Sequence, residues 1–262
     1  MGNSYYEVTE TIGSGVTSDQ IGRMYNRYSF AVSFCGNKDV LEVACGGGMG
    51  LGFIARTARS VTGVDVDEKI LRNAFDHYEG RDRISLGVMD GHSLDYDDDS
   101  FDVVILYEAI YYLERPLEFL KEAYRVLRDN GILMICTVNK DWGDFNPSPH
   151  SIEYPDVPEL AEMVGNVFQS VCVFGAFSTR PESFGGVVTS FIKRAAVSMH
   201  LMPRTMKGKE LLKKIFYGGL VPLPPEISEG MSTYKEPVEI AGDTKNEDYK
   251  IIYAIGRKQR SL

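Results

Sequence analysis

Apolar residues in the first part of this chain gather into short runs, separated by segments with helical spacing. The short runs predict five buried strands, at residues 39–44, 60–65, 84–91, 100–106 and 132–138. Helical spacing of apolar positions, together with capping residues, predicts helices at residues 17–36, 51–58, 116–127 and 156–165. Strands that alternate with helices favour a parallel sheet with right-handed crossovers, so the pattern predicts an α/β fold.

The last part of the chain adds two further strands that lie far apart in the sequence. Residues 166–177 form a long β-like run, and residues 248–257 form another. Residues 178–247 separate the two. We therefore expect a single domain over residues 1–262, with an N-terminal helical cap at residues 1–37 and an insertion or lid at residues 178–247.

Composition and charge exclude several classes of protein. The net charge of −9 argues against nucleic acid as a substrate or partner. No apolar run approaches the ~18 residues of a membrane-spanning helix, and the first residues have neither the basic start nor the apolar core of a signal peptide. The four cysteines are scattered and the four histidines show no zinc-ligand spacing, so we expect a cytoplasmic protein without disulfides or a metal site.

A glycine-rich turn after the first predicted strand is the strongest sign of a binding site. Gly46, Gly47 and Gly48 follow the strand at 39–44 and precede the helix at 51–58. Glycine lets a ligand approach the backbone, and the N-terminus of the following helix offers free N–H groups. The Gly-x-Gly-x-x-Gly pattern of dinucleotide-binding proteins would need a glycine at position 51, which is leucine. The turn therefore predicts a nucleotide-type site and disfavours an NAD-dependent oxidoreductase.

Two acidic residues end the next two strands of the predicted sheet. Asp65 ends the strand at 60–65, about 20 residues after Glu42, where nucleotide-binding folds place the carboxylate that holds the ribose hydroxyls. Asp90 lies at the end of the strand at 84–91. Because ligands bind at the carboxyl ends of the strands in such sheets, we expect both carboxylates beside the glycine turn.

From residue 38 to about residue 140, the order of these motifs resembles that of the class I S-adenosylmethionine (SAM)-dependent methyltransferases, in particular the methyltransferase type 11 group. The first motif of that family is acidic-x-Gly-x-Gly-x-Gly, and it maps onto Glu42, Ala44, Gly46 and Gly48. Alanine stands in place of the first glycine, and it suits the turn if its φ is negative. The resemblance implies a Rossmann-like, doubly wound sheet of seven strands in the order 3-2-1-4-5-7-6, the last strand antiparallel, with an α-helical insertion between the last two strands.

The resemblance also implies SAM as the cofactor and S-adenosylhomocysteine as its product. The residues that it places at the cofactor are Glu42, Ala44, Gly46, Gly48, Asp65, Val66, Asp90, Gly91, His92 and Tyr107. Asp65 would hold the ribose and Asp90 the adenine amino group, whereas His92 would line the site. In the N-terminal cap, Arg27 would pair with the methionine carboxylate or form a surface salt bridge.

The exit of the fourth strand differs from the family pattern at positions that face the methyl-transfer site. Many relatives carry Glu-x-x-Glu-His there, and this chain has Glu108 at the first position but Tyr111 and Tyr112 at the last two. The histidine that could serve as a base in relatives is therefore absent. The candidates for catalysis are Tyr111, whose other interpretation is a packing residue, and His150 in the loop after the fifth strand.

Within the insertion, residues 191–217 are strongly basic. They hold seven lysines and arginines against one glutamate, a net charge of +6, and their apolar residues recur near helical spacing. Basic amphipathic helices bind anionic membrane surfaces or meet anionic acceptors. The other interpretation is a pair of surface helices that pack on the core or on a second copy of the chain, so peripheral membrane contact and a homo-oligomer are both expectations.

The identity of the acceptor rests on a second and less specific resemblance. Residues 146–151, 174–177 and 206–212 are similar to methyltransferases encoded beside bacterial cell-surface polysaccharide genes. This implies a small-molecule or glycan acceptor and O-methylation of a sugar hydroxyl. Two alternatives stay open: a methyltransferase of a quinone, lipid or polyketide-type metabolite, and a non-catalytic SAM-binding partner subunit.

Overall fold

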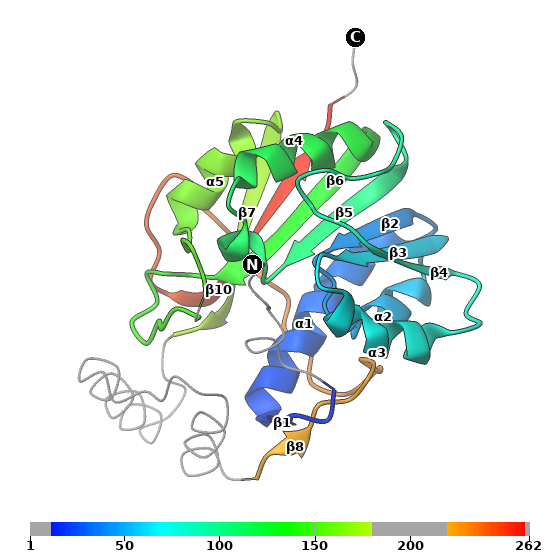
Figure 1. The fold of residues 1–262 in the computed structure, drawn as a ribbon. Coiled ribbons are helices and arrows are strands. Elements are labelled where there is room, and N and C mark those ends of the chain that lie inside the picture. Colours follow the sequence, from blue (N-terminus) through cyan, green and yellow to red (C-terminus); the bar gives the residue numbers. More distant parts are fainter. Residues whose placement is uncertain (1–11, 149, 180–218, 260–262) are drawn as a thin grey trace.

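A computed structural model describes residues 12–148, 150–179 and 219–259, and it contains a central sheet with helices on both faces (Figure 1). The strands of this sheet are β2 (Asp39–Val43), β3 (Ser60–Asp65), β4 (Ile84–Val88), β5 (Phe101–Tyr107), β6 (Leu127–Val138), β7 (Ser170–Ser178), β9 (Val238–Ile240) and β10 (Tyr249–Arg257). The helices are α1 (Ser18–Cys35), α2 (Leu51–Ala55), α3 (Glu68–Tyr78), α4 (Pro116–Val126) and α5 (Val157–Gly165), with a short 3-10 turn η2 (Ile110–Tyr112). A separate pair of short strands, β1 (Gly15–Val16) and β8 (Val221–Pro222), joins the N-terminal segment to the described part of the insertion.

The strand order confirms the predicted topology and adds one strand to it. The order is β4-β3-β2-β5-β6-β10-β7-β9, with parallel pairing from β4 to β6 and β10 antiparallel between β6 and β7. At the edge, Val238 of β9 lies opposite Gly175 of β7. The described sheet therefore has eight strands where seven were predicted, because part of the insertion continues the sheet. The helices predicted within residues 191–217 lie outside the described residues.

Both faces of the central strands are buried. Val40 and Ile105 pack towards α1, α2 and α3, whereas their neighbours Leu41 and Val104 pack towards α4 and α5, and all four side chains are fully buried. Figure 1 shows these two groups of helices on opposite sides of the sheet. A parallel sheet covered on both faces needs apolar residues at successive positions, which explains the continuous apolar runs in the sequence.

The cap helix α1 begins and ends where the sequence predicts. The Thr17 hydroxyl accepts a hydrogen bond from the Gln20 amide (3.2 Å), and the Gln20 side chain accepts one from the Thr17 amide (3.0 Å). This reciprocal capping box satisfies two backbone donors at the start of the helix. At its other end the helix stops at Cys35, immediately before Gly36.

A segment that we call the strap, residues 219–235, ties α1 to the turn that precedes α2. The Asn26 side chain of α1 donates to one backbone carbonyl of the strap (3.1 Å) and accepts from the amide of Lys235 at its end (2.6 Å). The Ile227 amide of the strap donates to the Met49 carbonyl, 2.9 Å away, just before α2. The insertion is therefore connected physically to the glycine-rich turn.

The described residues were compared with what a membrane-spanning helix, a metal site and a disulfide each require. No helix in this part of the chain has both the length and the apolar composition needed to span a bilayer. The same residues contain no cluster of three side chains suited to hold a metal ion. All four cysteines are free thiols, and only Cys172 is exposed.

Candidate functional site

A large cavity opens at the carboxyl ends of the parallel strands. Its volume is about 1190 Å³. Its wall comes from the glycine-rich turn, from α1, from the loops after β3, β4 and β5, and from the loop after β6. The neighbours of β2 are β3 on one side and β5 on the other, so the cavity lies at the topological switch point of the sheet. Single-ligand pockets typically measure about 300–1,000 Å³, so this cavity exceeds the upper end of that range.

The turn after β2 runs through the left-handed region of backbone space. Ala44 has a φ of 55°, Gly46 of 57° and Gly48 of 75°. The condition of a negative φ at Ala44 is therefore not met, and an alanine there costs about 1–2 kcal/mol relative to a relaxed conformation. Ala44 and Gly46 line the cavity, but Gly48 does not. A Cβ on Gly48 would lie 2.9 Å from the Cβ of Ala74 in α3, so this glycine serves close packing behind the turn.

Asp65 is the carboxylate that joins the turn to the next loop. Its Oδ2 accepts a hydrogen bond from the Gly46 amide and its Oδ1 one from the Asp67 amide, both at 2.9 Å. Burial raises the pKa of Asp65, although these amide hydrogen bonds oppose the shift. A carboxylate has about four acceptor positions, so two backbone amides leave capacity for ligand hydroxyls. The next side chain, Val66, is 55% exposed and lines the same cavity.

Asp90 and His92 form a compact pair at the end of β4. The Asp90 Oδ1 accepts hydrogen bonds from the His92 amide (2.9 Å) and contacts the His92 Nδ1 (2.6 Å). Burial alone would raise the pKa of Asp90, but the hydrogen bonds from His92 lower it below its ordinary value. The other ring nitrogen of His92 accepts from the Arg115 amide (3.4 Å). Both residues and Gly91 line the cavity, and the imidazole is held by the loop on both sides.

Glu42 lies behind the turn and is not part of the cavity wall. Its side chain is 1% exposed, and the Tyr28 hydroxyl donates to its Oε1 at 2.6 Å. The Tyr28 ring passes directly over Gly50, where a Cβ would overlap it. Burial raises the pKa of Glu42 to about 7, although the Tyr28 hydrogen bond and the Arg27 charge oppose that rise. The acidic residue of the motif therefore supports the turn from inside.

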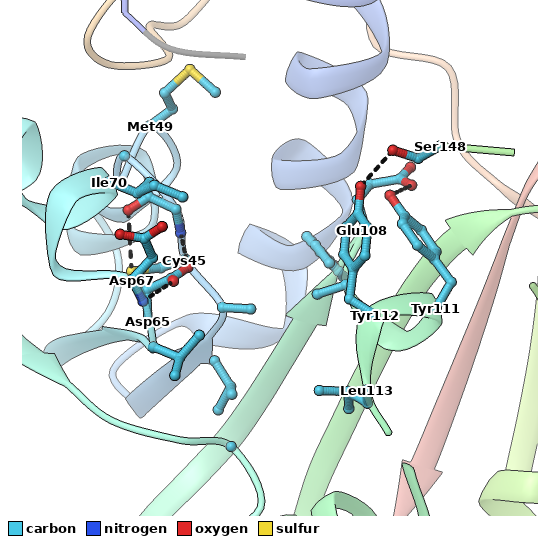
Figure 2. Close-up of a pocket in the computed structure, with 18 of the residues that line it drawn as sticks. Cys45, Met49, Asp65, Asp67, Ile70, Glu108, Tyr111, Tyr112, Leu113 and Ser148 are labelled. Carbon is cyan, nitrogen blue, oxygen red and sulfur yellow. Dashed lines mark hydrogen bonds between the residues drawn. The ribbon is translucent and has the colours of Figure 1, made fainter. Parts of the chain in front are cut away.

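The opposite wall of the cavity is built from the exit of β5 (Figure 2). Glu108 follows the last residue of β5 with a φ of 54°, and its carboxylate forms a salt bridge with Arg27 of α1 (3.2 Å). The Tyr111 hydroxyl donates to the other carboxylate oxygen (3.3 Å). Tyr107 also lines the cavity, and within the described structure its buried hydroxyl has no hydrogen-bond partner. Arg27 is thus a cavity residue in a largely buried pair, which excludes a surface salt bridge.

Aromatic rings and hydroxyl groups continue this wall. The Tyr112 hydroxyl and the Ser148 hydroxyl are 2.7 Å apart, and the Tyr111 ring stacks on Tyr154 with centroids 4.0 Å apart. Trp142 and Ser148, which were not among the predicted site residues, come from the loop after β6. No motif or spacing marks these two residues, because their place depends on how the loop crosses the sheet edge.

The two predicted catalytic residues separate in the structure. Tyr111 lies on the cavity wall, whereas His150 is exposed, has a φ of 67° and lies outside the wall. The amide and the hydroxyl of Ser151 both donate to the Ser148 carbonyl, at 3.2 and 2.7 Å. This tight turn directs the chain so that Ser148 reaches the cavity and His150 does not. Of the predicted cofactor residues, all except Glu42 and Gly48 line the cavity, and their roles stay predictions.

Comparison with known proteins finds similarity over part of the chain. A family model described as a methyltransferase domain matches residues 41–135. A probable SAM-dependent methyltransferase of Mycolicibacterium smegmatis is 35% identical over 106 residues, which is 40% of either chain. The demethylmenaquinone methyltransferase of Clavibacter sepedonicus is 31% identical over 134 residues, 51% of this chain and 54% of that protein. These alignments therefore span only about two fifths to one half of the length of those relatives.

Solved structures agree with the fold over nearly the whole chain. A SAM-dependent methyltransferase of Thermotoga maritima, described as a possible histamine N-methyltransferase, superposes with a TM-score of 0.59 over 92% of both chains. The sequence identity is 15%, so this likeness concerns the fold alone. The matched residues 41–135 contain the glycine-rich turn, Asp65, Asp90 and the exit of β5. Over these residues the chain matches a methyltransferase domain and is similar to SAM-dependent methyltransferases.

Proposed function

We propose that this protein transfers a methyl group from SAM to a hydroxyl of a small acceptor, and that the acceptor is a sugar. The observation that supports this most directly is the single cavity that joins two different walls. One wall carries the glycine-rich turn and two carboxylates, and the other carries Glu108, Tyr111, Tyr112 and Ser148. Figure 2 shows the two walls facing each other across the cavity.

The residues of the first wall fit the cofactor. Asp65 keeps acceptor capacity for the ribose hydroxyls, and the exposed Val66 beside it offers an apolar surface for the adenosine. Asp90 is 53% exposed at its side chain, so it remains accessible to the adenine amino group. Ala44 and Gly46 would lie against the methionine end. When bound, SAM supplies an electrophilic methyl group whose sulfur leaves as a neutral thioether.

The second wall supports a hydroxylated ring as the acceptor. Aromatic side chains offer flat apolar surfaces with specific geometry, and Tyr112 and Trp142 supply them here. Glu108 and Ser148 supply hydrogen-bonding groups at the same wall. Sugar rings combine apolar faces with hydroxyls around their edges, so both properties of the wall are used. The residues that hold the acceptor also fix the direction from which its oxygen approaches.

A quinone-type acceptor is the second candidate, because one relative is a demethylmenaquinone methyltransferase. The same aromatic side chains would hold a flat hydroxylated ring of that kind. The two candidates differ in what reaches the polar groups of the wall: several hydroxyls for a sugar, one or two for a hydroquinone. An acceptor screen therefore separates them.

The test begins with the cofactor and then turns to the acceptor. In a thermal-shift titration, a ligand that binds only the native state adds about 2.7 kcal/mol of stability at 100 times its Kd. We expect S-adenosylhomocysteine to stabilise the protein and NAD to have no effect. Labelled SAM is then offered with alkyl glycosides, nucleotide-linked sugars and hydroquinones. Stabilisation by NAD alone would refute the proposal, and cofactor binding without transfer to any acceptor would favour a non-catalytic SAM-binding subunit.

A further inference from the structure

We infer that Glu108 binds the reacting hydroxyl of the acceptor and takes its proton, while Arg27 and Tyr111 position this carboxylate. Together the three residues select uncharged hydroxyl-bearing acceptors over anionic ones. This inference rests on the proposed methyltransferase function and names the group that acts at its acceptor end. It assigns to Glu108 the role that the sequence placed on Tyr111 or His150.

The backbone of Glu108 is the first support. A φ of 54° is unfavourable for any residue with a Cβ, and glutamate lacks the short side chain that lets asparagine or aspartate adopt it more readily. The Glu108 amide donates to the Cys136 carbonyl of β6 (2.8 Å), which anchors the residue at the edge of the sheet. Such conformations persist when the surrounding structure enforces them, and they cluster at functional sites. Here the strained position carries a carboxylate at the cavity wall.

The partners of the carboxylate are the second support. Arg27 binds one oxygen and Tyr111 binds the other, so the group is held from both sides. The Tyr111 ring is itself fixed by its stack on Tyr154. Each carboxylate oxygen still has a further acceptor position, and the Glu108 side chain is 18% exposed within the cavity. A ligand hydroxyl therefore finds an oriented acceptor with free capacity on either oxygen.

The hydrogen-bonding character of the carboxylate explains the selectivity. A carboxylate oxygen only accepts hydrogen bonds, so it pairs with a ligand hydroxyl but offers no donor to a ligand carboxylate or phosphate. Arg27 compensates the charge of Glu108, so the pair presents little net charge to attract a cation.

In the proposed transfer step, Glu108 acts as the general base. The proton of the acceptor hydroxyl passes to Glu108 as the acceptor oxygen forms its bond to the methyl carbon. The bond between that carbon and sulfur breaks, and its electron pair remains on sulfur. General base catalysis of this kind contributes about 10²–10⁴-fold in rate.

The single tryptophan of the chain gives a test that does not depend on turnover. Trp142 lines the acceptor end of the cavity, so its fluorescence reports binding there. With S-adenosylhomocysteine saturating, the protein is titrated with phenyl glucoside or hydroquinone as uncharged probes and with phenyl glucuronide as the anionic counterpart. We expect an uncharged probe to bind the unaltered protein at least tenfold more tightly than the glucuronide. In Glu108→Gln this ratio should fall below threefold, with affinity for S-adenosylhomocysteine within threefold.

Control variants separate the inference from loss of structure. Glu118→Gln removes an exposed carboxylate of α4 outside the cavity wall and should leave the ratio unchanged. If Glu108→Gln fails to fold because Arg27 is left unpaired, the double variant Arg27→Met with Glu108→Gln removes both charges and should fold without selectivity. Arg27→Lys keeps the positive charge and should retain more selectivity than Arg27→Met. For an acceptor found by the screen, Glu108→Gln should lower kcat by at least 100-fold with a smaller change in KM.

Several outcomes would overturn the inference. Unchanged selectivity in Glu108→Gln would do so, as would equal binding of charged and uncharged probes by the unaltered protein. Failure of both uncharged probes to bind, with S-adenosylhomocysteine bound, would also overturn it. Failure of S-adenosylhomocysteine itself to bind would refute the proposed function instead, so the two failures are distinguishable.

Discussion

We expect Glu42 to make the stability of the protein fall as the pH rises from about 4 to 8, opposite to the usual effect of native carboxylates. Its pKa in the folded protein is raised to about 7, against an ordinary value of 4.5, because the side chain is buried behind the glycine-rich turn. Between these two values the folded state binds more protons than the unfolded state. The stabilisation is therefore complete below about pH 4.5 and is lost as the pH rises through about 7.

The magnitude follows from the difference between the two pKa values. At 1.36 kcal/mol per pKa unit, the interval from 4.5 to about 7 corresponds to about 3 kcal/mol of unfolding free energy. In a domain of this size, that amounts to roughly 6–12 °C in Tm. In Glu42→Gln the side chain is neutral at every pH, and its carbonyl oxygen can still accept the Tyr28 hydrogen bond.

Urea unfolding at a series of pH values measures this effect as the difference between the unaltered protein and Glu42→Gln. The two proteins should differ little near pH 4, and the variant should be more stable by about 3 kcal/mol near pH 8. The exposed Glu118→Gln serves as control and should show no pH-dependent difference above about 0.5 kcal/mol. If the difference between the unaltered protein and Glu42→Gln were the same at every pH, the burial argument for Glu42 would be wrong.

Three further predictions concern the turn and the cofactor wall. Asp65→Ala and Asp90→Ala should each weaken binding of S-adenosylhomocysteine at least tenfold by calorimetry; Asp65→Ala should also cost about 1–3 kcal/mol of stability, because two backbone amides lose their acceptor. Equal affinity in both variants would contradict the cofactor assignment. Gly50→Ala should lower the free energy of unfolding, measured in urea, by about 1–3 kcal/mol, because its Cβ would overlap the Tyr28 ring. Gly47→Ala has open space at its Cβ and should change that free energy by less than about 0.5 kcal/mol. Ala44→Gly should raise the free energy of unfolding by at most about 1 kcal/mol, because glycine tolerates the positive φ. A loss of stability would show that the turn is not strained there.

Much of the fold is predictable because its signals are local. Each buried strand is a short apolar run, and the carboxyl ends of parallel strands must share one edge, which brings Asp65 and Asp90 to the same cavity. The edge strand β9 has only three residues, two of them exposed, so no periodicity marks it. Its existence depends on the free edge of β7, which is a property of the assembled sheet.

The parts of the site that the sequence did not reveal depend on contacts between distant residues. Arg27 and Glu108 are 81 positions apart, and although the sequence marks each of them, nothing in it indicates that they pair. The exposure of His150 follows from a turn closed by hydrogen bonds to Ser148, and the positive φ of Ala44 from the path of the whole turn. Patterns along the chain therefore locate the site, whereas the pairing of its side chains requires the folded structure.

The central position of β10 has a consequence for how the chain is made. β10 separates β6 from β7, and its residues Ile251–Ile255 are buried, yet it is synthesised after all the other described strands. At about 5–20 residues per second, the ribosome needs several seconds to proceed from the end of β7 to the end of β10. During that interval β6 and β7 each present an unpaired edge, which is a template for association with other chains. The nascent protein is therefore most vulnerable to aggregation between the synthesis of β7 and that of β10, when a chaperone that shields strand edges would have its greatest effect on yield.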